Sequence, residues 1–254
     1  SKDSGKFRYG INIEGLYGTC WSCSWKPLIP TLMEASGEPF HVVKKLLDGL
    51  HYVSRENIPL TKGKLKLPSH GPLAPAHRKY LRSRGFDPSH LEQFWGLRGI
   101  TIHARLSWRI LIPIHYRGEI VSWTTRSISD KGTRYVNAKP NEESVSPKTL
   151  LAGEDHCRHS IIVVEGPMDL YRIGPGAAAT MGLVVTTAQV ERIAKYPVRV
   201  IVFDSEPEAQ QRANRLCQNL SCFPGKTVRV EIDSPDPGSA SDREIKRLRK
   251  AFLE

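Results

Sequence analysis

Acidic residues follow apolar runs in the carboxyl-terminal part of this sequence, and that pattern constrains the fold more than any other feature. Residues 161–164 are all apolar and mostly β-branched, and Glu165 follows them directly. A short run of this kind is typical of a strand that is buried on both faces of a parallel sheet. Residues 198–203 form a second such run, and it leads directly into Asp204. The sequence therefore predicts two central strands, each with a carboxylate at its end.

A third run, residues 226–232, alternates as an edge strand does, and it leads to Asp233 and Asp236. Ligands of open α/β sheets bind beyond the carboxyl ends of the strands, and carboxylates there suit a hard divalent cation. A single acid in a strand-to-helix loop is often only a helix N-cap, so Asp204 alone would carry little weight. Three strands that deliver acids to one edge favour a metal site.

The spacing of these acids resembles the Toprim domain of topoisomerases and DnaG-type primases. The residues that carry the resemblance are Glu165, Gly166, Asp169, Asp204, Glu206, Asp236 and Pro237. Upstream segments resemble the polymerase core of the DnaG-type primases in the same order: 109–114, 118–120, Arg126 and 134–137. Tyr80, Leu81, Arg84, Gly85 and Phe94 resemble its earlier helical segment. The likeness extends from about Phe7 to the last residues.

The resemblance implies a site for Mg²⁺ or Mn²⁺ whose ligands are Glu165, Asp204, Glu206 and Asp236. Glu165 is expected to act as a ligand or a proton acceptor, and Asp169 to support the catalytic site. Two departures from the family pattern weaken one metal position. Glu206 is one methylene longer than the usual aspartate, and Gly238 stands where a second acid is usual.

The resemblance also implies a basic surface beside the acids, formed by Arg109, Arg126, Arg134, Tyr135, Asn137 and Lys148. The three arginines lie on or near a predicted hairpin that turns at Arg117 and Gly118, so they are expected to lie close together. Guanidinium groups bind the phosphates of a template strand and of an incoming nucleotide. Any one of them taken singly fits an exposed strand residue equally well.

Cys20 and Cys23 form a CxxC pair in a predicted β-hairpin near the start of the sequence. Structural zinc takes four ligands, usually as two such pairs, and no second pair follows. The stretch resembles the second half of the CHC2-type zinc ribbon of these primases. Residues 1–27 are therefore interpreted as a zinc-ribbon remnant, whose Zn²⁺ site is complete only if an upstream pair exists. Aromatic residues on this hairpin fit either stacking on template bases or a small hairpin core.

The predicted fold class is α/β with an α+β amino-terminal part: a Toprim-type parallel sheet flanked by helices. Residues 28–75 are expected to hold two helices, separated near Gly37, and a proline-rich tether. Residues 76–155 are assigned to the amino-terminal subdomain of a primase core, with the basic face. Residues 156–254 are assigned to the metal-binding catalytic subdomain.

The charge of the chain favours a polyanionic partner. The 254 residues include 37 Lys and Arg against 26 Asp and Glu, a net charge of +11. Phosphate neutralisation is the usual source of affinity for nucleic acid, although a basic protein without such a partner remains an alternative. No window approaches the roughly 20 apolar residues of a membrane span, and no secretory signal opens the sequence. Five cysteines with one CxxC pair suit a reducing compartment, so a cytoplasmic location in a bacterium or a phage-infected host is expected.

These inferences predict a DNA primase that makes short RNA primers on single-stranded DNA from ribonucleoside triphosphates by metal-dependent nucleotidyl transfer. One alternative is a Toprim nuclease or nicking enzyme that uses the same acids but has no evident use for the arginine-bearing hairpin. Another is a non-catalytic single-strand binder, which would lack affinity for divalent metal. The sequence has no GxxxxGK[ST] phosphate-binding loop, so a replicative helicase is expected to act in trans, as for a phage protein.

Overall fold

The computed structural model describes residues 9–12, 17–20, 24–49, 63–129, 132–221 and 223–254, with side chains from residue 28 onward except 45–49. Its first part is a small antiparallel sheet in the order β1-β2-β3, formed by Tyr9–Asn12, Tyr17–Cys20 and Ser24–Pro27. The predicted hairpin at the start of the chain is therefore present. Cys23 lies outside the described residues, so the zinc-ribbon interpretation stays a prediction.

Two helices follow, α1 (Leu28–Ser36) and α2 (Phe40–Gly49). Gly37 separates them with a φ of +71°, a left-handed conformation that glycine adopts readily, which confirms the predicted break. Leu28, Ile29 and Val43 pack into the same apolar core as one face of the parallel sheet described below. Of the tether predicted to follow, residues 55–62 lie outside the described residues, and residues 63–74 lie in no helix or named strand.

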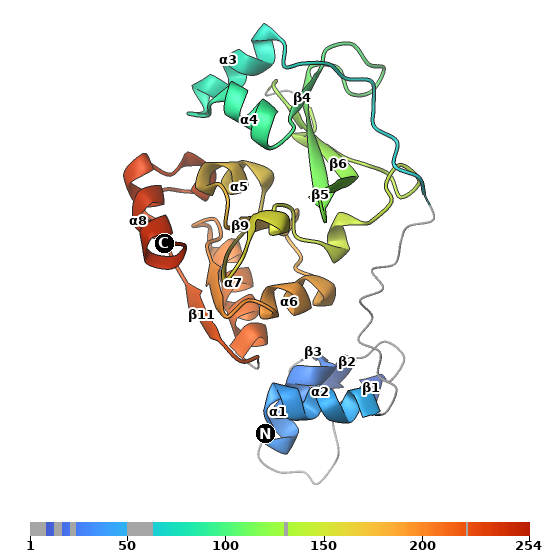
Figure 1. Ribbon diagram of the computed structural model, residues 1–254, viewed down its shortest axis with the longest axis vertical. Coiled ribbons are helices and arrows are strands. Elements are labelled where there is room, and N and C mark those ends of the chain that lie inside the picture. The colour runs from blue at the N-terminus through green and yellow to red at the C-terminus, as the bar shows by residue number, and fades with distance from the viewer. Residues whose placement is uncertain (1–8, 13–16, 21–23, 50–62, 130–131, 222) are drawn as a thin grey trace.

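An antiparallel sheet in the order β4-β5-β6-β7 forms the middle of the chain (Figure 1). Two helices, α3 (Pro75–Ser83) and α4 (Pro88–Phe94), precede this sheet. The strands are β4 (Arg98–Ile100), β5 (Arg109–Tyr116), β6 (Glu119–Ser127) and β7 (Tyr135–Asn137). Arg117 and Gly118 join β5 to β6 with φ values of 54° and 81°. Positive φ at both positions is typical of a type I′ turn, whose twist matches that of a hairpin. The predicted hairpin and its turn are confirmed.

A parallel sheet forms the carboxyl-terminal part, in the order β11-β10-β8-β9. The strands are β8 (Ser160–Val164), β9 (Ala177–Ala179), β10 (Val198–Ile201) and β11 (Lys226–Arg229). Residues 161–164 of β8 are 0% exposed, as a central strand requires, whereas β11 lies at the edge. The predicted α/β fold with a parallel sheet is confirmed.

Helices cover both faces of the parallel sheet: α5 (Pro167–Ile173), α6 (Thr187–Ala194), α7 (Pro207–Ser221) and α8 (Asp242–Phe252). Ile162 and Val200 pack with α5, α8 and the apolar residues of β5, so the antiparallel sheet is joined to this face. Ile161 and Ile201 point to the other face, where α6 and α7 lie. None of the helices in the described part of the chain has the length and apolar character that crossing a membrane requires.

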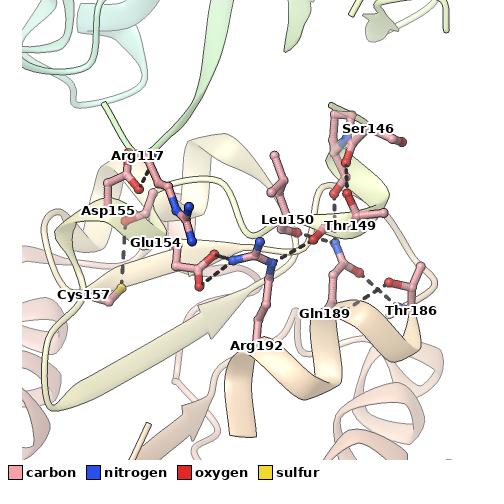
Figure 2. A network of polar contacts seen from close by, with 12 residues as sticks. Arg117, Ser146, Thr149, Leu150, Glu154, Asp155, Cys157, Thr186, Gln189 and Arg192 are labelled. Carbon is pink, nitrogen blue, oxygen red and sulfur yellow. Dashed lines mark hydrogen bonds and ion pairs between the residues drawn. The ribbon is translucent and has the colours of Figure 1, made fainter. Parts of the chain in front are cut away.

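A buried polar network fixes the segment that connects the two sheets, which carries the short helices η1 (Pro147–Thr149) and η2 (Glu154–His156). Figure 2 shows Gln189 and Arg192 of α6 pointing towards this segment. Arg192 donates to both carboxylate oxygens of Glu154, at 3.0 and 2.8 Å, and to the carbonyl oxygen of Thr149. The side-chain amide of Gln189 donates to the carbonyl oxygens of Pro147, Leu150 and Thr180. These bonds hold the connection, and with it the antiparallel sheet, against α6.

Candidate functional site

A pocket of about 360 Å³ lies between the carboxyl edge of the parallel sheet and the antiparallel sheet. Its acidic wall comes from the parallel sheet: Glu165 directly after β8, Asp204 after β10, Asp236 after β11, and Asp169 on α5. Its opposite wall contains Arg84, Thr124, Arg126, Arg134, Tyr135 and Asn137. The topology thus brings residues that are far apart in the sequence to one cavity with an acidic and a basic side.

Asp204 is the acid of this pocket that has a buried oxygen, Oδ1, without a hydrogen-bond partner among the described residues. Burial, followed by the negative charges of Glu165, Asp236 and Glu206, raises the pKa of Asp204 to about 6. A buried carboxylate oxygen without a donor, surrounded by like charges, gains from a nearby cation.

Glu165 forms an ion pair that the sequence did not reveal. Its Oε1 atom accepts hydrogen bonds from Nε and Nη2 of Arg212, at 3.0 and 2.8 Å, and its side chain is only 10% exposed. Arg212 lies on α7, and nothing in the spacing of that helix marks it as a site residue. The pair compensates the charge of Glu165 and fixes the orientation of its carboxylate.

Asp169 connects two loops of the site. Its carboxylate accepts from the backbone N–H of Gly166, at 3.0 Å, and from that of Gly238, at 2.9 Å. Burial, and then the charges of Asp204 and Asp236, raise the pKa of Asp169 to about 7. These contacts suit the supporting role predicted for Asp169.

Gly238 belongs to the short helix η3 (Pro237–Ser239), whose first residues follow Asp236. A Cβ atom at position 238 would lie 2.9 Å from Oδ1 of Asp169 and 3.1 Å from Oδ1 of Asp236. The close approach of the Gly238 N–H to Asp169 therefore leaves no room for a side chain. Glycine at this position lets the carboxylates of Asp169 and Asp236 both approach the backbone closely.

The acids do not form a closed metal cage. Within the described ranges, no group of three or more His, Cys, Asp or Glu side chains is placed to hold a metal ion by itself. Glu206 is exposed and does not line the pocket, although its charge is close enough to raise the pKa of Asp204. Mg²⁺ is commonly held by one or two carboxylates together with substrate phosphates and water. The remaining acids and the orphaned oxygen of Asp204 fit an ion that arrives with a phosphate.

Arg126 is the centre of the opposite wall. Its guanidinium donates to the hydroxyl oxygens of Tyr80, at 2.9 Å, and Tyr135, at 2.7 Å, and it lies 4.9 Å from the ring centroid of Tyr135. Arg134 and Asn137 are exposed residues of the same pocket. The structure thus gathers Arg126, Arg134, Tyr135 and Asn137 as predicted.

Arg84 in this wall and Tyr80 behind Arg126 come from the α3 region, and neither was among the predicted site residues. Arg84 lines the pocket, and its Nε atom is buried without a hydrogen-bond partner in the described part of the chain. Tyr80 holds Arg126 from the same segment. The signal that could have found them is the basic helix before Gly85, whose family-like residues include both.

Arg109 does not reach the pocket, which corrects the expectation that the three arginines share one basic face. Its buried guanidinium donates to the hydroxyl of Thr125 and to the carbonyl oxygens of Thr133 and Arg134. These bonds fasten β5 to the β6–β7 connection, in place of the phosphate contact predicted for Arg109. Lys148 lies at the rim, where its ammonium group is 3.4 Å from the carbonyl oxygen of Met181.

The raised pKa values of Asp169 and Asp204 predict how the metal-free protein responds to pH. Both values lie above the ordinary 3.8, so the folded state binds these protons more tightly than the unfolded state does. Ionisation therefore costs stability as the pH rises from 5 to 8. With EDTA present, we expect the melting temperature of the wild type to fall more between pH 5 and pH 8 than that of Asp204→Asn, which has no carboxylate to ionise at this position. Equal differences in the two proteins would contradict the assignment.

Comparisons with known proteins place this geometry in a fold family. No protein-family model matches the chain, and no curated protein matches its sequence. Among solved structures, the zinc-binding and RNA polymerase domains of the Aquifex aeolicus primase superpose with a TM-score of 0.59 at 16% identity, over 99% of this chain and 77% of that one. A DnaG primase catalytic domain bound to single-stranded DNA has the same TM-score and identity, over 82% of this chain and 76% of the other.

A bacteriophage protein shows the same likeness. The primase fragment of the bacteriophage T7 primase-helicase protein gives a TM-score of 0.51 at 15% identity, over 91% of this chain and 89% of that one. The chain therefore has the fold of a DnaG-type primase catalytic core, and the predicted resemblance is confirmed at the level of the fold.

Proposed function

We propose that this protein is a DNA primase that synthesises short RNA primers on single-stranded DNA by nucleotidyl transfer. The observation that carries the proposal is one pocket, in a primase-like fold, in which Glu165, Asp204 and Asp236 form one wall and Arg126 and Arg134 the other. Nucleotidyl transfer needs both walls, because acids hold the metal while cationic groups bind phosphates.

The residues of the pocket divide between these tasks. Asp204 and Asp236, with Glu165 oriented by Arg212, would hold Mg²⁺ or Mn²⁺, which would supply activation of the attacking 3′-hydroxyl and charge stabilisation of the pyrophosphate. Arg84 and Arg134 are placed to bind phosphate oxygens, and Arg126 is kept in position by two tyrosine hydroxyls. Asp169 keeps the loops that carry Gly166 and Gly238 together.

The substrates and partners follow from the same proposal. Ribonucleoside triphosphates are the substrates, a single DNA strand is the template, and a helicase acts in trans. Two of the structural neighbours are a primase domain bound to single-stranded DNA and a fragment of a primase-helicase protein, which supports these assignments. Cys20 and Cys23 are proposed to bind Zn²⁺ only where a second pair of ligands is present.

The direct test is a primer-synthesis assay on single-stranded DNA of mixed sequence, with labelled ribonucleotides and Mg²⁺ or Mn²⁺. We expect RNA products a few to some tens of nucleotides long that are absent when EDTA replaces the metal. Cleavage of the template in place of RNA synthesis would instead indicate a nuclease that uses the same acids. Tight binding of the template with neither reaction would indicate a non-catalytic single-strand binder.

A further inference from the structure

A second pocket, of about 550 Å³, adjoins the acidic pocket at Pro167, which lines both. It is formed where α4 and the β5–β6 turn meet η2 and α5. Residues from both halves of the fold line it, among them Phe94, Trp95, His115, His156 and Tyr171. Apart from Pro167, none of the residues that line this pocket lines the acidic pocket.

Aromatic rings form most of one wall. The ring of His156 lies 4.8 Å from that of Phe94 and 5.0 Å from that of Trp95, centroid to centroid. Trp95 in turn lies 5.2 Å from Tyr171. Phe94 is 42% exposed, which is unusual for a large apolar ring in a packed cluster. His90 stacks on Phe94 with 5.4 Å between the ring centroids, so only the part of the Phe94 ring that stays exposed beside His156 is open to a flat ligand.

The pocket also offers polar groups. Trp95 is 5% exposed, and its indole N–H is buried without a hydrogen-bond acceptor among the described residues. Such a buried donor costs free energy until it finds a partner. His115 also lines the pocket, and burial, as the largest cause, lowers its pKa, which favours a neutral ring with one donor and one acceptor.

The lining of the pocket contains one guanidinium group and one carboxylate. Arg117, at the β5–β6 turn, is exposed and lines the pocket. The one carboxylate of the lining, that of Asp155, already accepts from the backbone N–H groups of Arg117 and Gly118. A ligand with a flat polar ring and an attached phosphate matches this combination of rings, donors and guanidinium.

We propose that this pocket binds a nucleobase of the single-stranded DNA, stacked against Phe94 and His156 with its phosphate near Arg117. The inference rests on the proposed function for the identity of the strand. A strand that crosses Pro167 passes from the acidic pocket to this one, so the bound base would lie a short distance along the template from the reacting position. The pocket would hold the template through one base that is no longer stacked on its neighbours in the strand.

The test measures binding without catalysis, by fluorescence anisotropy of a labelled oligonucleotide in EDTA. A series of oligonucleotides carries one abasic site at each position in turn. If one base enters the pocket, an abasic site at that position weakens binding to the wild-type protein by about fivefold or more, the loss typical of one stacked base. Phe94→Ala is expected to weaken binding of the intact strand by a similar factor and to be insensitive to the abasic site. Phe94→Leu, which keeps the apolar volume, should behave in the same way.

Trp108→Ala is the matched control, because Trp108 is 49% exposed and lines neither pocket. We expect it to bind the strand as the wild type does and to keep the sensitivity to the abasic position. Equal losses in Trp108→Ala and Phe94→Ala, or the absence of any sensitive position, would overturn the proposal.

Primer synthesis is measured separately, so the two proposals can fail independently. If the protein makes RNA but Phe94→Ala does not weaken strand binding, the primase proposal is supported and the base-pocket proposal is rejected. If Phe94→Ala loses the affinity that depends on one base but no RNA synthesis is detected, the base-pocket proposal is supported and the polymerase proposal is rejected.

Discussion

Replacing Asp204 with asparagine is expected to reduce RNA synthesis on the order of a hundredfold or more. The change removes the negative charge of the one acid whose buried oxygen lacks a partner in the described part of the chain. Loss of a residue that merely orients a metal ligand already costs roughly 10- to 100-fold, so loss of a ligand should cost at least that. The measurement is the rate of primer synthesis at saturating template.

Asp233→Asn is the control for this variant. Asp233 also follows a strand of the parallel sheet, but its side chain is 88% exposed and does not line the pocket. We expect its activity to match that of the wild type. Without metal, Asp204→Asn should melt no lower than the wild type at pH 7.5, because it relieves the repulsion from Glu165 and Asp236. Retained activity, or a large loss of stability, would argue against a metal-binding role for Asp204.

Replacing Arg192 with methionine is expected to lower the free energy of unfolding by about 3 kcal/mol. The side chains of Arg192 and Glu154 are only 11% and 15% exposed, so the change leaves the carboxylate of Glu154 largely buried without its cation. Burial already raises the pKa of Glu154, although Arg192 opposes that shift. Urea unfolding followed by circular dichroism measures the loss.

A double-mutant cycle separates the ion pair from the packing of Arg192. Glu154→Gln combined with Arg192→Met should recover part of the lost stability, since the buried charge is then gone. Arg243→Met on α8 is the exposed control and should change stability by less than about 0.5 kcal/mol. A loss below about 1 kcal/mol for Arg192→Met would show that the network in Figure 2 does not hold the two sheets together.

Several elements could be predicted because their signal is local. Residues 161–164 and 198–201 are strands since a short β-branched run is stable only when a sheet buries it. The strand Ala177–Ala179 has no such local signal. Three alanines have neither the length nor the β-branched side chains that mark a strand. They form one because β8 offers an unpaired edge, which is a tertiary fact.

The candidate site divides in the same way. Glu165, Asp204 and Asp236 could be predicted as neighbours since parallel strands end at one edge of a sheet. Arg212 pairs with Glu165 only because α7 packs across that edge. Glu206 was predicted as a ligand from its place two residues after Asp204, but its side chain is exposed and does not line the pocket.

The sequence by itself determined the parallel sheet, the hairpin with its turn at Arg117 and Gly118, and the edge at which the acids collect. These features follow from side-chain periodicity and backbone preferences, which act over a few residues. Only the tertiary structure decided which charges face the pocket. Arg109 and Arg126 lie on neighbouring strands of one hairpin, yet Arg109 is satisfied by carbonyl oxygens and Arg126 by tyrosines beside the acids. A guanidinium takes its role from the acceptors around it, and those come from distant parts of the chain.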